Sequence, residues 1–209
     1  MPSNPFLVSN DEPVGSVAVQ EKRERDVLLG EYEFTVGPQQ PPRTTTFQGR
    51  GFPLALMGEV APVWLMGVHG GAGASTLASL LTGAAESHQA WPLSHAEEPP
   101  AHVLLVARTH AHGLAALKRA TSQWASGELP EAQVQLLGTV LVADGPSPAK
   151  ALVKELRQVG AMSPRTWHLT WNEQWRSLTS ADDHPLNTRG RMTVRSLSKA
   201  LSLTPKNQP

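Results

Sequence analysis

The sequence of 209 residues contains no cysteine, which excludes disulfide bonds, thiol catalysis and zinc sites built on thiolates. It also lacks an excess of charge, because 18 lysine and arginine residues balance 18 aspartate and glutamate residues. This balance argues against nucleic-acid binding over the whole surface, but not against a local basic patch. No apolar run reaches the roughly 18–20 residues of a membrane-spanning helix. The N-terminus has neither a basic region nor an apolar core, so we expect no signal peptide and a cytoplasmic protein.

Proline and glycine, in contrast, are abundant, with 18 and 17 residues. Residues 1–50 combine proline with mixed charge, and such a segment buries too little apolar surface to offset its chain entropy. We expect a disordered N-terminal segment there. The apolar island at residues 27–36 has two interpretations: a loosely packed tail, which we favour, or a short strand that docks on the domain or binds a partner.

The most informative stretch is Val63–Leu81, in which an apolar run, a glycine-rich loop and an amphipathic segment follow one another. The apolar residues of the last segment have helical spacing, at Leu77, Leu80, Leu81 and Ala84. Glycines let backbone N–H groups turn toward an anion, and the start of a helix favours negative charge. The stretch therefore predicts a phosphate-binding loop between a strand and a helix. The alternative is a tight strand-to-helix connection that binds no ligand.

The loop sequence HGGAGAST resembles the deviant P-loop of ParA/MinD-type ATPases, but it lacks both lysines of that loop. Ala74 stands where a P-loop has the lysine that reaches the phosphates, and His69 stands where the family has its signature lysine. Losing a charge-assisted hydrogen bond of ~1.5–3 kcal/mol would weaken phosphate binding about ten- to a hundred-fold. The loop is also similar to the G-x-H-G-G-A-G-x-[ST]-T loop of uncharacterised actinobacterial proteins that are linked with mobile elements.

The resemblance implies that the loop binds ATP or ADP, with Mg²⁺, through backbone N–H groups and hydroxyls. The loop residues concerned are His69, Gly70, Gly71, Ala72, Gly73, Ala74, Ser75 and Thr76. Ser75 is the Mg²⁺ ligand that the resemblance implies.

Downstream, apolar runs at residues 102–108, 135–143 and 165–170 predict strands, and helices are expected between Gly113 and Gly127 and at residues 149–159. Residues 87–101 are expected to form a loop. This alternation predicts an α/β fold with a mostly parallel sheet of about four to five strands and helices on both faces. We assign residues 51–180 to this reduced P-loop NTPase-like domain. Ligands bind such sheets beyond the carboxyl ends of the strands.

Three residues after the later strands are candidates for the same site. Asp144 has two interpretations: a carboxylate that holds Mg²⁺ through water, and a turn-forming residue before Gly-Pro, which we favour. Trp171 and Asn172, with Glu173, occupy the stretch that closes the nucleotide pocket in ParA/MinD proteins. An indole there can stack on a base, although large aromatics more often pack in a core.

The histidines that follow expected strands raise the question of a metal site, since neutral imidazole is a common ligand. His110 and His112 are expected on the same edge of the sheet as His69. No carboxylate or further histidine falls at a recognised ligand spacing. We therefore favour exposed or hydrogen-bonded histidines and assign no metal to them.

The resemblance also argues against ATP hydrolysis, because switch I and Walker B would have to lie between Glu86 and His102, an interval too short for them. We predict a degenerate ParA/MinD-like protein that binds nucleotide or is a pseudo-ATPase. It would act as a binding or localisation factor in DNA partition or plasmid transfer, and no catalytic residue is assigned. Two alternatives stay open: an active ATPase in which His69, a partner's lysine or Arg108 supplies the missing charge, and a structural interaction module without nucleotide.

Residues 181–209 form a basic C-terminal tail with a short amphipathic helix. Its apolar stripe comprises Val194, Leu197, Ala200 and Leu201. Such a helix can contact nucleic acid, an anionic membrane or an acidic partner. The alternative, which we favour, is a helix that packs on the domain with its charge outward. We expect a protein partner and leave self-association open.

Overall fold

The computed structural model describes residues 33–43, 46–177 and 184–205, so the disorder expected for residues 1–32 lies outside the described residues. Five parallel strands form the centre of the sheet in the order β9-β8-β7-β3-β5. Their bounds are β3 (Val63–Gly67), β5 (Ala84–His88), β7 (Ala101–Arg108), β8 (Val134–Val142) and β9 (Arg165–Leu169). The predicted α/β class with a mostly parallel sheet is confirmed.

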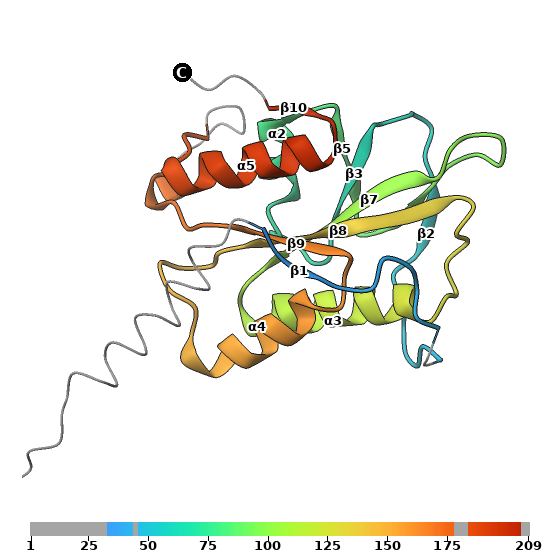
Figure 1. The fold of residues 1–209 in the computed structure, drawn as a ribbon, viewed down its shortest axis with the longest axis horizontal. Coiled ribbons are helices and arrows are strands. Elements are labelled where there is room, and N and C mark those ends of the chain that lie inside the picture. The colour runs from blue at the N-terminus through green and yellow to red at the C-terminus, as the bar shows by residue number, and fades with distance from the viewer. Residues whose placement is uncertain (1–32, 44–45, 178–183, 206–209) are drawn as a thin grey trace, which may run out of the picture. The chain divides into compact units, whose positions relative to one another are not determined.

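Helices cover both faces of this sheet (Figure 1). On one face lie α2 (Ala74–Leu80) and α5 (Thr188–Ala200), and on the other lie α3 (Ala111–Ala125) and α4 (Val153–Gly160), which follows the short 3-10 helix η1 (Lys150–Leu152). Leu65, Leu77 and Leu197 belong to one buried cluster that joins β3, α2 and α5. Burying each such side chain contributes about 1.5–3 kcal/mol, which fixes both helices on the sheet.

The chain winds outward in two directions from β3. Leu65 of β3 lies opposite Glu86 of β5 on one side and opposite Leu104 of β7 on the other. In chain order the five parallel strands have the arrangement 2-1-3-4-5, so the winding reverses between β3 and β7. Doubly wound sheets bind ligands in the crevice at this switch point, beyond the carboxyl ends of the strands.

Two elements differ from the sequence prediction in the stretch after the loop. The helix ends at Leu80, because Leu81 is already extended (φ −124°, ψ 119°) and is fully buried as part of β4 (Leu81–Thr82). Gly83, with a φ of 85°, then turns the chain into β5. The expected loop at residues 87–101 contains the end of β5 and the strand β6 (Trp91–Leu93).

Residues 33–43 and 46–50, which were expected to be disordered, are part of the described structure. β1 (Glu33–Val36) pairs antiparallel with β9, which is the docked-strand alternative for this island. Farther along, Arg43 forms an ion pair of 2.7 Å with Glu131. β2 (Leu54–Leu56) then pairs in parallel with β6 in a separate two-stranded sheet.

The C-terminal helix α5 packs on the domain and keeps its charge outward. Val194 and Leu197 are buried, whereas the side chains of Arg191 and Arg195 are exposed. Ala200 is also exposed, so it does not belong to the buried stripe. After α5, β10 (Thr204–Pro205) pairs antiparallel with β4. None of the described helices has the length and hydropathy needed to cross a membrane.

Candidate functional site

The glycine-rich loop joins β3 to α2 through two residues in the left-handed region. Gly71 has a φ of 72° and Gly73, the N-cap of α2, has a φ of 96°, conformations that favour glycine. Gly70 and Gly71 face open space, whereas Ala72 and Ala74 are buried. The loop therefore exposes backbone beside the first turn of α2, where the N–H groups lack acceptors within the helix.

His69 lies inside the loop rather than on its surface. The side chain is 7% exposed, and its Nδ1 lies 2.8 Å from the carbonyl oxygen of Gly70. Its Nε2 accepts a hydrogen bond of 3.1 Å from the backbone N–H of Arg108. These bonds place the ring proton on Nδ1. Burial lowers the pKa of His69 below its usual value, so the ring is neutral at pH 7. A neutral, fully bonded imidazole does not replace the charge of a lysine.

The three histidines at this edge do lie together, as the sequence suggested. The ring of His69 is 5.0 Å from that of His110 and 5.9 Å from that of His112, between centroids. His110, however, caps α3 by accepting a 2.9 Å hydrogen bond from the N–H of Gly113. Within the described ranges, no group of three His, Cys, Asp or Glu side chains is arranged to hold a metal ion.

Arg108, the last residue of β7, connects the loop to the end of the neighbouring strand. Its Nε donates to the carbonyl oxygen of Gly71 (3.3 Å) and its Nη1 donates to that of Ala143 (3.2 Å). A guanidinium has five N–H donors, so these two bonds leave three that can bind an anion. The side chain is half-buried, which places a fixed positive charge beside the glycine-rich loop.

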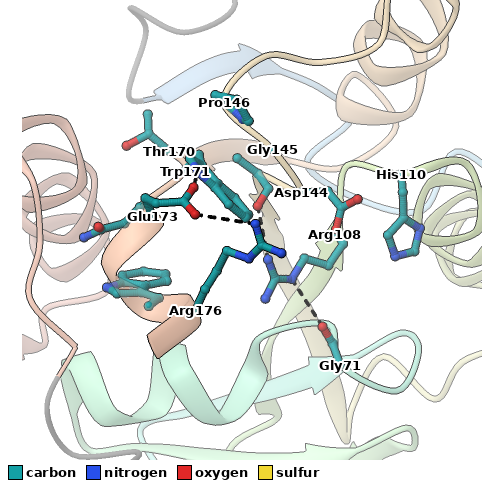
Figure 2. Close-up of a pocket in the computed structure, with 13 residues that line it drawn as sticks. Gly71, Arg108, His110, Asp144, Gly145, Pro146, Thr170, Trp171, Glu173 and Arg176 are labelled. Carbon is teal, nitrogen blue, oxygen red and sulfur yellow. Dashed lines mark hydrogen bonds and ion pairs between the residues drawn. The ribbon is translucent and has the colours of Figure 1, made fainter. Parts of the chain in front are cut away.

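A pocket of about 720 Å³ opens at the carboxyl ends of β7, β8 and β9 (Figure 2). Its size is in the range of small-molecule sites. The lining comes from the loop and from the segments that follow the three strands: Gly71, Arg108, His110, Ala143, Asp144, Gly145, Pro146, Thr170, Trp171, Asn172, Glu173, Trp175 and Arg176. Two guanidinium groups, two carboxylates and two indoles thus share one concave surface.

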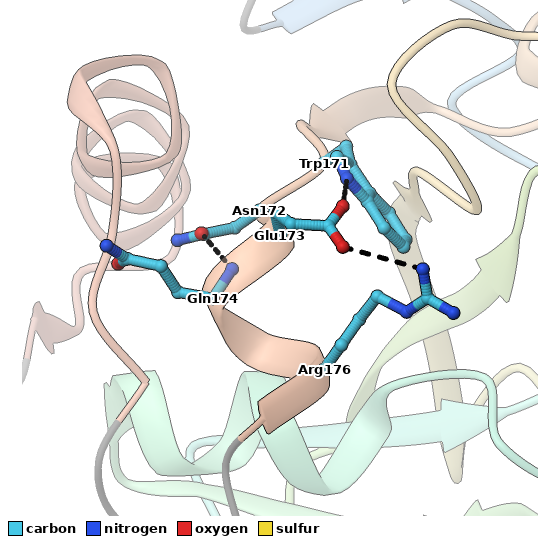
Figure 3. A network of polar contacts seen from close by, with 5 residues as sticks. All are labelled: Trp171, Asn172, Glu173, Gln174 and Arg176. Atoms are coloured by element: carbon cyan, nitrogen blue, oxygen red, sulfur yellow. Dashed lines mark hydrogen bonds and ion pairs between the residues drawn. The ribbon is translucent and has the colours of Figure 1, made fainter.

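One wall of the pocket is the 3-10 helix η2 (Glu173–Ser177) and the residues before it (Figure 3). Glu173 accepts hydrogen bonds from Trp171 Nε1 (2.9 Å) and from Arg176 Nη1 (3.4 Å). The Arg176 guanidinium lies 6.0 Å from the Trp171 ring centroid, within cation–π range. Both partners of the Glu173–Arg176 pair are largely exposed, so this ion pair adds little stability and Arg176 can exchange it for a ligand.

Asn172 holds this wall in place. Its Nδ2 donates to the carbonyl oxygen of Pro185 (2.5 Å), and its Oδ1 accepts a hydrogen bond from the N–H of Gln174 (3.1 Å). Trp175 Nε1 donates to the same Pro185 oxygen (2.7 Å). The side-chain amide thus anchors η2 to the segment that precedes α5.

The structure brings together four of the predicted site residues, Gly71, Asp144, Trp171 and Asn172. The exposed Ser75 is not among the residues that line the pocket, and neither are the buried Ala72 and Ala74.

His110 and Arg176 also line the pocket, although neither was expected from the sequence in a nucleotide site. Trp167, Trp171 and Trp175 are spaced four residues apart in the sequence. Trp167 is a core residue, 1% exposed, whereas Trp171 and Trp175 line the pocket. The sequence did contain a sign that Arg176 belongs to the site. This arginine follows Trp171 by five residues, in a segment that was expected at the ligand-binding edge of the sheet.

These features define a doubly wound α/β protein with a glycine-rich loop at the switch point of its sheet and an arginine-lined pocket beside that loop. The chain belongs to the family of unknown function DUF6668, whose sequence model matches residues 61–194. The matched range begins just before β3 and ends inside α5, so it includes the loop and the pocket. Searches among curated proteins and among solved structures found no match.

Proposed function

We propose that this chain is a degenerate ParA/MinD-like P-loop protein that binds a nucleotide, ATP or ADP, in the pocket beside its loop and does not hydrolyse it. In this proposal it is a cytoplasmic binding or localisation factor in DNA partition or plasmid transfer. The observation that carries the proposal is the position of Arg108, whose guanidinium is fixed between Gly71 of the loop and Ala143 of the neighbouring strand end.

Arg108 supports phosphate binding because it supplies the charge that Ala74 and the neutral His69 do not. Its planar fork matches the oxygen geometry of a phosphate, and its remaining donors face the pocket. Arg176 adds a second guanidinium on the opposite wall, and both side chains line the same space (Figure 2). A polyphosphate between two cations in a partly desolvated pocket gains more than it would at an open surface.

The other end of the pocket suits a planar group. Trp171 is half-buried, and Glu173 fixes its indole through the Nε1–H bond. A base stacked on an aromatic side chain contributes about 1–3 kcal/mol. The phosphates would then lie near the loop, between Arg108 and Arg176, and the base against the indole of Trp171.

The residues present do not fit a Mg²⁺ ion held by both Ser75 and Asp144, because Ser75 does not line the pocket that Asp144 lines. Asp144 is exposed, and its backbone N–H is bonded to Thr109 Oγ1 (3.0 Å), as in a fixed turn. Phosphoryl transfer depends on a metal that bridges the β- and γ-phosphates and on a positioned nucleophile. The arrangement therefore supports binding without turnover.

The test is calorimetry of ATP and ADP binding, with and without Mg²⁺. We expect micromolar affinity for the wild type. Arg108→Gln should weaken it about ten- to a hundred-fold, in line with the loss of a charge-assisted bond. Gly73→Val should also abolish binding, since valine does not adopt the φ of 96° without strain.

Arg157→Gln is the matched control, because Arg157 is exposed on α4 and does not line the pocket. We expect unchanged affinity for this variant. In a separate assay, the wild-type protein should release phosphate from ATP no faster than buffer alone. A wild-type protein that binds neither nucleotide at millimolar concentration would overturn the proposal.

A further inference from the structure

His110 lies on the same wall of the pocket as Arg108, beside the glycine-rich loop. Both residues line the pocket (Figure 2). His110 is half-buried and follows Arg108, the last residue of β7, by two positions, directly before α3 begins. A side chain so close to the Arg108 guanidinium is in a position to contact the same ligand.

The hydrogen bond that caps α3 determines where the ring proton of His110 lies. Nδ1 accepts a 2.9 Å hydrogen bond from the N–H of Gly113, and a ring nitrogen accepts only when it carries no proton. The ring that forms this cap is therefore neutral, with its proton on Nε2. Because the two nitrogens of an imidazole point in diverging directions, the Nε2–H is directed away from Gly113 and the first turn of α3.

The two neighbouring histidines do not offer such a donor to the pocket. His69 uses both of its ring nitrogens, one with the carbonyl of Gly70 and the other with the N–H of Arg108. His112 is exposed and is not among the residues that line the pocket. Nε2 of His110, in contrast, has no hydrogen-bond partner within the described ranges. A donor that is held in place without an acceptor is available to a ligand.

This wall of the pocket offers donors to a ligand. The carbonyl oxygens of Gly71 and Ala143 are already bonded to Arg108, and the guanidinium keeps further N–H groups that these bonds do not use. The Nε2–H of His110 adds a neutral donor on the same wall. Several donors on one wall match a phosphate group, whose oxygens are strong acceptors in several directions.

The imidazole of His110 is also held in position before a ligand binds. Its ring centroid lies 5.0 Å from that of His69 and 6.3 Å from that of His112. Its carbonyl oxygen accepts a 3.0 Å hydrogen bond from the N–H of Leu114, which fixes the backbone at the start of α3. A preorganised donor binds without the full cost of ordering a side chain.

We propose that His110 binds a phosphate group of the ligand through its Nε2–H, while its Nδ1 keeps the cap on α3. This assignment rests on the proposed function, because it requires a polyphosphate in the pocket. It makes His110 a ligand of the phosphates and not of the base. Its loss should therefore weaken the binding of ATP and of inorganic triphosphate by the same factor.

The test is calorimetry of ATP and inorganic triphosphate with a variant that keeps the cap. His110→Asn is suited to this, because Asn187 caps α5 in the same way, with its Oδ1 accepting from the N–H of Gly190 (2.7 Å). Asparagine is shorter than histidine, so it has no donor at the position of Nε2. We expect about tenfold weaker binding of both ligands at unchanged stability in urea. His112→Asn is the matched control and should bind both ligands as the wild type does.

A second measurement separates a ligand contact from a purely structural cap. Long-range proton–nitrogen correlation NMR of the full chain reports on the histidine rings, and the signals of His110 are those that His110→Asn lacks. We expect the free protein to carry the ring proton on Nε2. Inorganic triphosphate should then shift the Nε2 resonance more than that of Nδ1, whereas a residue that only caps α3 would show no such shift.

The contrary results are distinguishable. Wild-type affinity for triphosphate in His110→Asn, at unchanged stability, would overturn this assignment and leave the nucleotide proposal standing. A wild type that binds triphosphate but neither nucleotide would overturn the proposed function alone, and a tenfold loss of triphosphate binding in His110→Asn would still support the assignment. A wild type that binds no polyphosphate at millimolar concentration would overturn both.

Discussion

The backbone N–H of Arg108 donates a hydrogen bond to Nε2 of His69, so the imidazole ties the glycine-rich loop to the end of β7. This bond fixes the strand end from which the Arg108 guanidinium reaches Gly71. His69 thus positions the positive charge of Arg108 instead of supplying one. The loop therefore holds its shape through a neutral residue.

Replacing His69 with lysine should therefore destabilise the protein and not improve nucleotide binding. A lysine has no acceptor for the Arg108 N–H, and leaving a buried donor unpaired costs about 1–3 kcal/mol. Urea unfolding measures this loss. His112→Lys is the control, because His112 is exposed, and it should change stability little. Higher affinity for ATP in His69→Lys, at unchanged stability, would contradict this account of the loop.

Stability should fall as the pH falls from 7 to 4, because of His168 on β9. Burial lowers the pKa of His168 from 6.5 to about 4, and its Nδ1 is buried without a partner among the described residues. The unfolded chain binds the proton first, so the stabilising effect is complete above pH 6.5 and is lost progressively toward pH 4. At pH 5 this residue should cost about 2 kcal/mol relative to pH 7. His69 contributes in the same direction.

Unfolding in urea at pH 7 and pH 5 measures the effect. His168→Leu should reduce the difference between the two pH values without lowering stability at pH 7, since it removes a buried polar atom that lacks a partner. His95→Gln, at an exposed site, should leave the difference unchanged. An undiminished pH dependence in His168→Leu would show that other groups cause it.

Gln123→Leu should destabilise the protein by about 3 kcal/mol, because it leaves the backbone groups of Phe52 and the indole N–H of Trp91 without their partner. Ser122→Ala, on the same helix, is the control. Thermal or urea unfolding distinguishes these variants, and a loss below about 1 kcal/mol in Gln123→Leu would show that water replaces the amide.

Trp171→Leu should lower the affinity for ATP about five- to a hundred-fold and the affinity for inorganic triphosphate much less, because only the nucleotide has a base to stack. Arg108→Gln should weaken both ligands, since both place phosphates beside the loop. Competition between the two ligands in calorimetry separates these effects. Equal losses for ATP and triphosphate in Trp171→Leu would place the base elsewhere.

The sequence predicted the parallel centre of the sheet because β3, β7 and β8 are apolar runs of strand length, and such runs are typical of strands buried on both faces. It did not predict β5, whose residues Ala84–His88 include no β-branched or aromatic side chain. Only its place beside β3 makes this segment a strand. Leu81 and Ala84 continue the helical spacing of the apolar residues in α2. The hydrophobic pattern therefore did not show that the helix ends at Leu80 and that the chain is extended from Leu81.

The pocket was predicted in part for the same reason. Asp144 and Trp171 follow apolar strands, and parallel topology brings such positions to one edge. The role of His69 could not be read from the sequence, because it depends on the backbone of Arg108, 39 residues away. The four-residue spacing of the tryptophans also did not show that Trp167 is in the core and Trp171 in the pocket. Their burial depends on where the strand β9 ends, and not on the number of residues between them.

Because β10 pairs with β4, an engineered disulfide bond between the two strands would restrain the helix that follows the glycine-rich loop. Thr204 lies opposite Thr82, two residues after α2 ends. Since the chain has no thiol of its own, a pair of cysteines at these positions could cross-link only with each other within one molecule. Oxidising or reducing that bridge would fasten or release the last turn of α2, and so give reversible chemical control over the rigidity of the loop.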